Sequence, residues 1–163
     1  MIPALLFAAA LAVATPEHPS AAYPNEEAIE PYVQANANAG TKPFSDDALW
    51  KAFHGEAGVG RVVDELVDRS LADPRIKEVF ASHDMVRLRR TLREQFCYIL
   101  NGGCDYSGRD MKAVHKDLGV QNADFNALVE HLQIAMDHEK ISFRDQNRFL
   151  AKLAPMQRMA VER

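Results

Sequence analysis

The chain has 163 residues, of which 47% are hydrophobic and 26% are charged, with a formal net charge of -4. It is long enough for one domain with a buried core but too short for two ordinary domains. A mildly acidic chain lacks the positive surface that nonspecific nucleic-acid binding requires, and two cysteines exclude a disulfide-rich scaffold or a four-cysteine zinc module.

Residues 1–14 form an uncharged, apolar run that is shorter than the about 20 residues of a transmembrane helix. It ends in Ala12-Val13-Ala14, the small-x-small pattern of a signal-peptidase site. The run therefore predicts a signal peptide cleaved before Thr15, a periplasmic or exported protein, and no membrane span after cleavage. The alternative is a buried or mis-started N-terminus and a cytoplasmic protein, since the run lacks the usual Lys or Arg at its start.

Residues 15–43 contain five prolines, and their apolar residues show no regular period. Because proline blocks long helices, this stretch is predicted to be an extended leader or linker. The folded domain is predicted to cover residues 44–163.

From Ser45 onward, apolar residues recur every three to four positions, which is the period of a helix. No segment alternates between apolar and polar residues as a half-buried strand does, so the predicted fold class is all-α. Helices are expected near residues 49–53, 62–71, 85–99, 110–119, 122–136 and 142–156, with Pro155 kinking or restarting the last. Residues able to cap these helices are Ser82 or Asp84, Asp110, Asn122 and Ser142.

One of the six histidines has an unusual position. Met111, Val114, His115 and Leu118 fall at i, i+3, i+4 and i+7, which places His115 in an apolar stripe that is expected to face the core. A neutral imidazole in apolar surroundings is what an axial heme ligand requires. The alternative, a core histidine bonded to a backbone carbonyl, is favoured by the spacing alone.

Three other groups of residues are less specific. His131 and His138 lie seven positions apart on one predicted helix and are expected to be a solvated or half-buried pair. Cys97 and Cys104 could form a disulfide in an oxidising compartment or remain two buried thiols. A basic run on the helix near residues 85–99 is typical of a solvated face, although it could also neutralise a carboxylate: Arg87, Arg89, Arg90 and Arg93.

Several motifs occur together in a recognisable order. Leu-Ala-Asp-Pro follows the second predicted helix, a Phe precedes Met-x-Arg-Leu, and a Gly-rich turn leads into Tyr-Ser-Gly-Arg-Asp-Met. A histidine follows that methionine by four residues, and Leu-Ala-Pro-Met lies near the end. In these motifs the chain resembles group I truncated hemoglobins of bacteria from about Leu49 to Met156. The resemblance implies a two-over-two globin-like helical sandwich around a pocket for heme b. It also favours the interpretation of His115 as a heme ligand over that of a core histidine.

The resemblance also implies roles for individual residues. His115 matches the proximal histidine that binds the heme iron, Phe96 matches a residue that lines a ligand tunnel, and Tyr106 matches the tyrosine of the turn motif. Seven further residues are expected to contact the cofactor: Phe80, Leu88, Leu92, Met111, Leu118, Val120 and Phe125.

This chain departs from the family pattern on the side where the gas would bind. Val67 stands where many members carry a ligand-bonding tyrosine, and Leu88 and Leu92 occupy the other usual donor positions, so oxygen is expected to bind but leave fast. His83 and Gln95 are the nearest polar candidates for a replacement donor. The basic residue that often pairs with a heme propionate is replaced by Thr91, so that role is expected to pass to Arg87, Arg89 or Arg90.

The function implied first is reversible binding of a diatomic gas, namely oxygen, carbon monoxide or nitric oxide. An alternative is a nitric oxide dioxygenase or peroxidase-like heme enzyme, which needs a reductase as electron donor. A second alternative is a heme-free helical module that binds a protein partner.

Overall fold

The computed structural model describes residues 23–81 and 83–161. Every regular element in these residues is helical, which confirms the all-α prediction. The predicted signal peptide at residues 1–14 and the candidate cap Ser82 lie outside the described residues. The α-helices are α1 (Ala48–Ala52), α2 (Gly55–Ala72), α3 (Lys77–Ala81), α4 (Met85–Ile99), α5 (Met111–His115), α6 (Asn122–His138), α7 (Phe143–Leu153) and α8 (Gln157–Ala160); short 3-10 helices are η1 (Asn36–Ala39) and η2 (Ala154–Met156).

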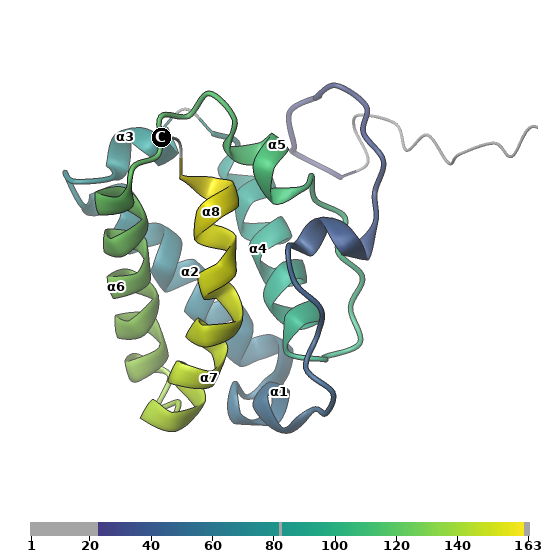
Figure 1. The fold of residues 1–163 in the computed structure, drawn as a ribbon, viewed down its shortest axis with the longest axis vertical. Coiled ribbons are helices and arrows are strands. Elements are labelled where there is room, and N and C mark those ends of the chain that lie inside the picture. Colours follow the sequence, from purple (N-terminus) through teal and green to yellow (C-terminus); the bar gives the residue numbers. More distant parts are fainter. Residues whose placement is uncertain (1–22, 82, 162–163) are drawn as a thin grey trace, which may run out of the picture.

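The helices form two layers, with α6, α7 and the short α8 in front of α2 and α4 (Figure 1). Helix α2 packs against both α4 and α6, so it joins the two layers, while α5 packs against α8. None of the helices in the described part of the chain is long and apolar enough to span a bilayer.

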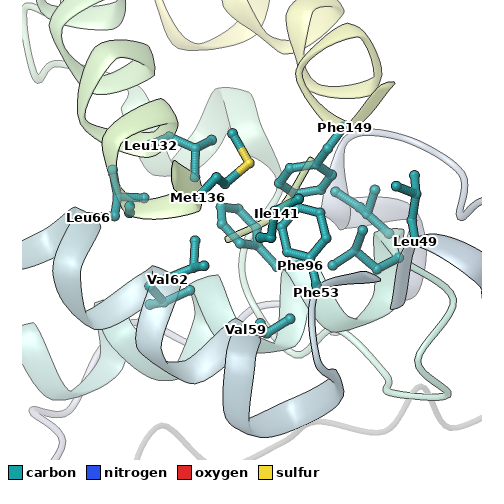
Figure 2. Close-up of a cluster of buried hydrophobic side chains, with 14 of the residues drawn as sticks. Leu49, Phe53, Val59, Val62, Leu66, Phe96, Leu132, Met136, Ile141 and Phe149 are labelled. Atoms are coloured by element: carbon teal, nitrogen blue, oxygen red, sulfur yellow. The ribbon is translucent and has the colours of Figure 1, made fainter. Parts of the chain in front are cut away.

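An apolar core fills part of the space between the layers (Figure 2). Three aromatic rings meet at its centre: Phe149 lies edge-on to Phe53 and Phe96, with centroid separations of 5.1 Å and 4.9 Å. Such edge-to-face pairs add about 0.5–1.5 kcal/mol each to the free energy gained by burial. Residues from both layers surround these rings, among them Leu49, Val59, Val62, Leu66, Leu132, Met136 and Ile141.

Side chains cap the starts of α4, α5, α6 and α7. Asp84 accepts hydrogen bonds from the backbone of α4, and Ser142 accepts one from Asp145 N at 3.2 Å, as predicted. The prediction that Asn122 caps the next helix is wrong by one residue. Asn122 is the first residue of α6, because the Asp124 carboxylate reaches back to the backbone N–H of Gln121 at 2.9 Å.

Helix α5 is shorter than predicted. It ends at His115 instead of near Gly119, since the backbone of Lys116 is extended and Asp117 has a left-handed φ of 63°. A single turn cannot bring the i+7 residue onto the face of the first one. The expected apolar stripe is therefore wrong in part, and Val114 is 42% exposed.

The segment at residues 23–43, predicted to be an extended leader, packs against the domain and contains η1. The Glu26 carboxylate is 2% exposed and forms ion pairs with Arg87 and Arg90 of α4. The Tyr32 hydroxyl donates to the Ser107 carbonyl at 2.6 Å, and Ala39 is completely buried in the core. These contacts make the segment a strap across α4 and the loop that follows it.

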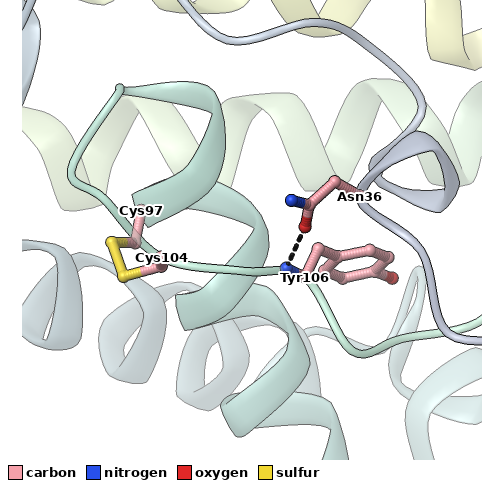
Figure 3. Close-up of a disulfide and its surroundings, with 4 residues drawn as sticks. All are labelled: Asn36, Cys97, Cys104 and Tyr106. Carbon is pink, nitrogen blue, oxygen red and sulfur yellow. Dashed lines mark hydrogen bonds between the residues drawn. A yellow bond between two sulfur atoms is a disulfide. The ribbon is translucent and has the colours of Figure 1, made fainter.

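A disulfide joins Cys97 of α4 to Cys104, with a Cα–Cα distance of 5.7 Å (Figure 3). The structure thus decides between the two states that the sequence left open. Nearby, the Asn36 side-chain oxygen accepts a hydrogen bond from the backbone N–H of Tyr106 at 2.7 Å. The disulfide and this bond both restrain the loop between α4 and α5.

Replacing both Cys97 and Cys104 by Ala is expected to lower the free energy of unfolding by about 2–3 kcal/mol, because the open loop has more conformational freedom in the unfolded chain. Denaturant unfolding of the oxidised protein and of the double variant measures the difference. Reductant should lower the stability of the wild type and leave the double variant unchanged. Equal midpoints for the oxidised wild type and the double variant would show that the disulfide does not stabilise the fold.

Candidate functional site

An apolar cavity of about 440 Å³ lies between the two layers. Its polar wall residues, within the described part of the chain, are Gln95, His115 and Asp124. The apolar wall residues come from helices α2 to α8 and the adjoining segments: Leu66, Val67, Val79, Phe80, Leu88, Leu92, Phe96, Met111, Val120, Phe125, Leu128, Val129, Leu132, Leu150, Ala151, Leu153, Ala154, Met156 and Ala160. A cavity with this lining suits a large apolar group with a few polar contacts.

Helix α5 places His115 in the cavity wall. The Asp110 carboxylate caps the helix by accepting from Lys112 N at 3.1 Å and Ala113 N at 3.0 Å, as predicted. One turn later, His115 Nδ1 lies 2.6 Å from the Met111 carbonyl oxygen. A carbonyl oxygen can only accept, so Nδ1 carries the proton and Nε2 keeps a lone pair. His115 thus offers a ligand nitrogen with a fixed tautomer.

Burial lowers the pKa of His115, and this is the largest influence on the group. The hydrogen bond to Met111 opposes the shift, while the nearby His83 adds to it. The net lowering favours the neutral imidazole at neutral pH. Neutral imidazole is the form that can coordinate a metal ion.

The cavity brings most of the predicted pocket residues together. Phe80, Leu88, Leu92, Met111, His115, Val120 and Phe125 all line it, as do Val67 and Phe96. Leu118 does not line the cavity, because the chain has left the helix two residues earlier. The sequence reasoning missed the wall formed by α6, α7 and the end of the chain: Leu128, Val129, Leu132, Leu150, Leu153 and Met156. Their helical period was visible, but a face that lines a cavity has the same period as one that packs in a core.

The described wall residues on α2 and α4 offer no free hydrogen-bond donor to the cavity. Val67, Leu88 and Leu92 are apolar, and His83 is not part of the wall. Both amide hydrogens of Gln95 have acceptors, since Nε2 lies 2.9 Å from the Ala39 carbonyl and 3.2 Å from Met111 Sδ. The part of the wall formed by α2 and α4 therefore presents an apolar surface to the cavity.

The arginines of α4 pair with carboxylates of the chain itself. Arg87 and Arg90 bind Glu26 of the strap, whereas Thr91 donates to the Arg87 carbonyl at 2.9 Å. For one of these arginines to pair with a heme propionate, it would have to give up an existing ion pair with a carboxylate of the chain. Further ion pairs of these arginines are Arg87 with Asp84, Arg89 with Asp64 and Asp68, Arg90 with Glu94, and Arg93 with Asp64.

His131 and His138 have separate environments, contrary to the expected solvated or half-buried pair. His131 is 5% exposed. Its Nε2 lies 2.9 Å from the Asp73 carboxylate, and its Nδ1 lies 3.2 Å from Ser70 Oγ. His138 is on the surface and pairs with Glu65 at 2.7 Å. His131 thus connects α6 to the end of α2 and has a structural role.

His131→Leu is expected to lower the free energy of unfolding by about 1–3 kcal/mol, because it removes the buried partner of Ser70 and Asp73. The matched control is His138→Leu, which removes only an exposed ion pair and should cost less than about 1 kcal/mol. Chemical denaturation measures both variants. Equal losses of stability in the two variants would contradict a structural role for His131.

The match to known families covers most of the chain. Residues 48–162 match the model of the bacterial-like globin family. The chain belongs to this family. A group 1 truncated hemoglobin of Nostoc sp. is 32% identical over 108 residues, which cover 66% of this globin and 92% of the relative. A group 1 truncated hemoglobin of Nostoc commune is 36% identical over 84 residues, which cover 52% of this globin and 71% of the relative. The predicted kinship with group I truncated hemoglobins is confirmed.

Solved structures share the fold of this globin. The truncated hemoglobin of Tetrahymena pyriformis, in its Fe(III) form, superposes with a TM-score of 0.67 at 22% identity, covering 71% of this globin and 98% of that chain. The 2/2 hemoglobin of Synechococcus sp. PCC 7002, in the cyanomet state with covalently attached heme, has a TM-score of 0.66 at 23% identity, again covering 71% and 98%. These matches confirm the predicted two-over-two fold.

Proposed function

We propose that this globin binds heme b in its apolar cavity, with His115 Nε2 as the ligand of the iron. With heme held there, the protein would bind a diatomic gas reversibly, namely oxygen, carbon monoxide or nitric oxide. The observation that carries the proposal is the position of His115 in the wall of the apolar cavity, where the hydrogen bond from Nδ1 to the Met111 carbonyl leaves Nε2 with its lone pair. The lowered pKa of His115 favours its neutral form and so supports the same role.

The residues of the cavity fit a porphyrin. Its wall is apolar apart from Gln95, His115 and Asp124, which suits a large, flat and mainly hydrophobic group. The 2/2 hemoglobin of Synechococcus carries heme in the same fold, which supports the assignment. When bound, heme would supply an iron able to take up a gas; His115 would hold that iron, and the apolar side chains of Val67, Leu88 and Leu92 would disfavour water in the cavity.

Replacing His115 by Ala is expected to abolish the absorption spectrum of ferrous, histidine-bound heme, because the iron loses its protein ligand. His138→Ala, a histidine on the surface, serves as the control and should retain the wild-type spectrum. Ferrous and carbon monoxide spectra of the purified proteins measure this. A His115→Ala variant with the wild-type ferrous spectrum would refute the ligand assignment, and a wild type without a Soret band after hemin addition would refute heme binding.

The apolar distal side implies weak retention of oxygen. Bound oxygen carries partial negative charge on its outer atom, and a hydrogen bond to such an acceptor is worth about 1.5–3 kcal/mol. Carbon monoxide carries less charge on its outer atom and depends less on such a bond. Val67, Leu88 and Leu92, which match the family's donor positions, are apolar and line the cavity, and this supports the absence of such a donor from the described wall on α2 and α4. We therefore infer that this globin discriminates against oxygen relative to carbon monoxide when compared with tyrosine-bearing relatives.

Val67→Tyr should slow oxygen release by about 10- to 150-fold, since a hydrogen bond of that strength converts at 1.4 kcal/mol per tenfold. Carbon monoxide release should change less. Val67→Phe is the matched control, because it introduces the same ring without the hydroxyl and should not slow oxygen release in this way. Stopped-flow measurement of both gases gives the rates, and equal oxygen release from the Tyr and Phe variants would contradict the role of the missing donor.

A further inference from the structure

Gln95 is a buried polar residue at the meeting point of the strap, α4 and α5. Its side chain is part of the cavity wall, and the residue is 6% exposed. Its amide nitrogen donates to the Ala39 carbonyl of the strap at 2.9 Å and to Met111 Sδ of α5 at 3.2 Å. The Gln95 amide thus bridges the strap and α5, at residues that lie 56 and 16 positions from Gln95 in the sequence.

Met111 anchors α5 to the rest of the fold. The helix has only five residues, and Lys112, Ala113 and Val114 are all exposed. Met111 is 7% exposed, so its side chain is the buried attachment of the first turn. The carbonyl of the same residue accepts the hydrogen bond of His115 Nδ1. A displacement of Met111 therefore moves the atom that orients the imidazole.

The strap confines Met111 from the other side. Gly40 has a left-handed φ of +85°, and a Cβ added there would lie 2.7 Å from Met111 Cγ and 3.1 Å from Met156 Sδ. Met111 is thus enclosed between Gln95 and Gly40. The absence of a side chain at Gly40 allows the strap to approach this closely.

We propose that Gln95 is a positioning residue for His115, acting through Met111, and that Ala39 and Gly40 of the strap complete this support. The proposal rests on the proposed function, because His115 needs an exact orientation only if it binds iron. Groups that hydrogen-bond or brace a ligating histidine set its ring orientation and basicity, so their loss changes the metal–histidine bond without removing the ligand. The strap is then part of the proximal side of the site.

The first test compares Gln95→Leu with Gln146→Leu. Gln146 is also a buried glutamine that bridges two segments, with Nε2 2.6 Å from Asp137 Oδ1 and 3.0 Å from the Ile141 carbonyl, but it does not line the cavity. The readouts are the iron–histidine stretching band of the ferrous protein in resonance Raman spectra, the rate of hemin transfer to apomyoglobin, and the unfolding midpoint of the heme-free protein. Both variants should lower the midpoint.

Gln95→Leu alone should shift or broaden the iron–histidine band. It should also speed hemin loss about three- to tenfold, the range that corresponds to one net hydrogen bond. Gln146→Leu should leave the band in place and hemin loss within twofold of the wild type. An unchanged band and hemin-loss rate in Gln95→Leu would overturn the proposal, and so would equal changes in both variants, because they would reveal a general effect of stability.

The second test uses a matched pair of glycines and keeps the proposal falsifiable if Gln95→Leu does not fold. Gly103 has a φ of +83°, close to that of Gly40, but a Cβ added there meets nothing within 4 Å. Gly40→Ala and Gly103→Ala therefore carry similar backbone strain, and only the former presses on Met111. Gly40→Ala should change the iron–histidine band, whereas Gly103→Ala should not. An iron–histidine band in Gly40→Ala that matches the wild type, or that shifts as much as the band in Gly103→Ala, would overturn the role of the strap.

Failure of this inference can be told apart from failure of the proposed function. A wild type that binds no heme, or that shows no iron–histidine band, refutes the proposed function and removes the basis of the inference. A wild type with a normal band, combined with Gln95→Leu and Gly40→Ala variants that keep it, refutes the positioning role alone.

Discussion

The hydrogen bond between His115 Nδ1 and the Met111 carbonyl is the contact on which the site depends. It selects the tautomer, and the direction of the Nε2 lone pair follows from it. The bond needs a short helix with a defined start, which the Asp110 cap provides. It also needs a fixed Met111, which Gln95 and the strap provide in the structure. A local backbone interaction thus relies on contacts that are remote in the sequence.

A large apolar cavity lowers the free energy of unfolding of a small domain, because the atoms lining it lack packing partners on one side. The structure offsets this with a dense core beside the cavity, where Phe149 packs edge-on against Phe53 and Phe96. Phe96 belongs to both regions, since it also lines the cavity. The buried His131 and the disulfide restrain the ends of helices around the same space.

The strap changes the electrostatics of α4 as well as its packing. Glu26 is buried between Arg87 and Arg90, so the basic run that the sequence suggested as a solvated face is neutralised by the chain itself. Desolvation of these groups strengthens their attraction compared with an exposed pair. The strap is therefore fastened by charge at Glu26 and by the buried Ala39 and the carbonyl contact to Gln95 farther along.

The sequence by itself determined most of the helices, most of the predicted caps and the family, because helical period and capping are local properties and the motifs stand at defined spacings. It also singled out His115, although spacing alone left a core histidine as the stronger interpretation. It did not predict the short helix α3, and it placed the start of α2 seven residues too late. Only the tertiary structure decided the roles of Gln95, His131 and Ala39. Each of these has a hydrogen-bond partner more than 50 positions away, and such contacts have no local signature. The end of α5 at His115 and the pairing of the two cysteines were likewise decided by how the loop between α4 and α6 packs, because propensity and spacing do not specify the path of a loop.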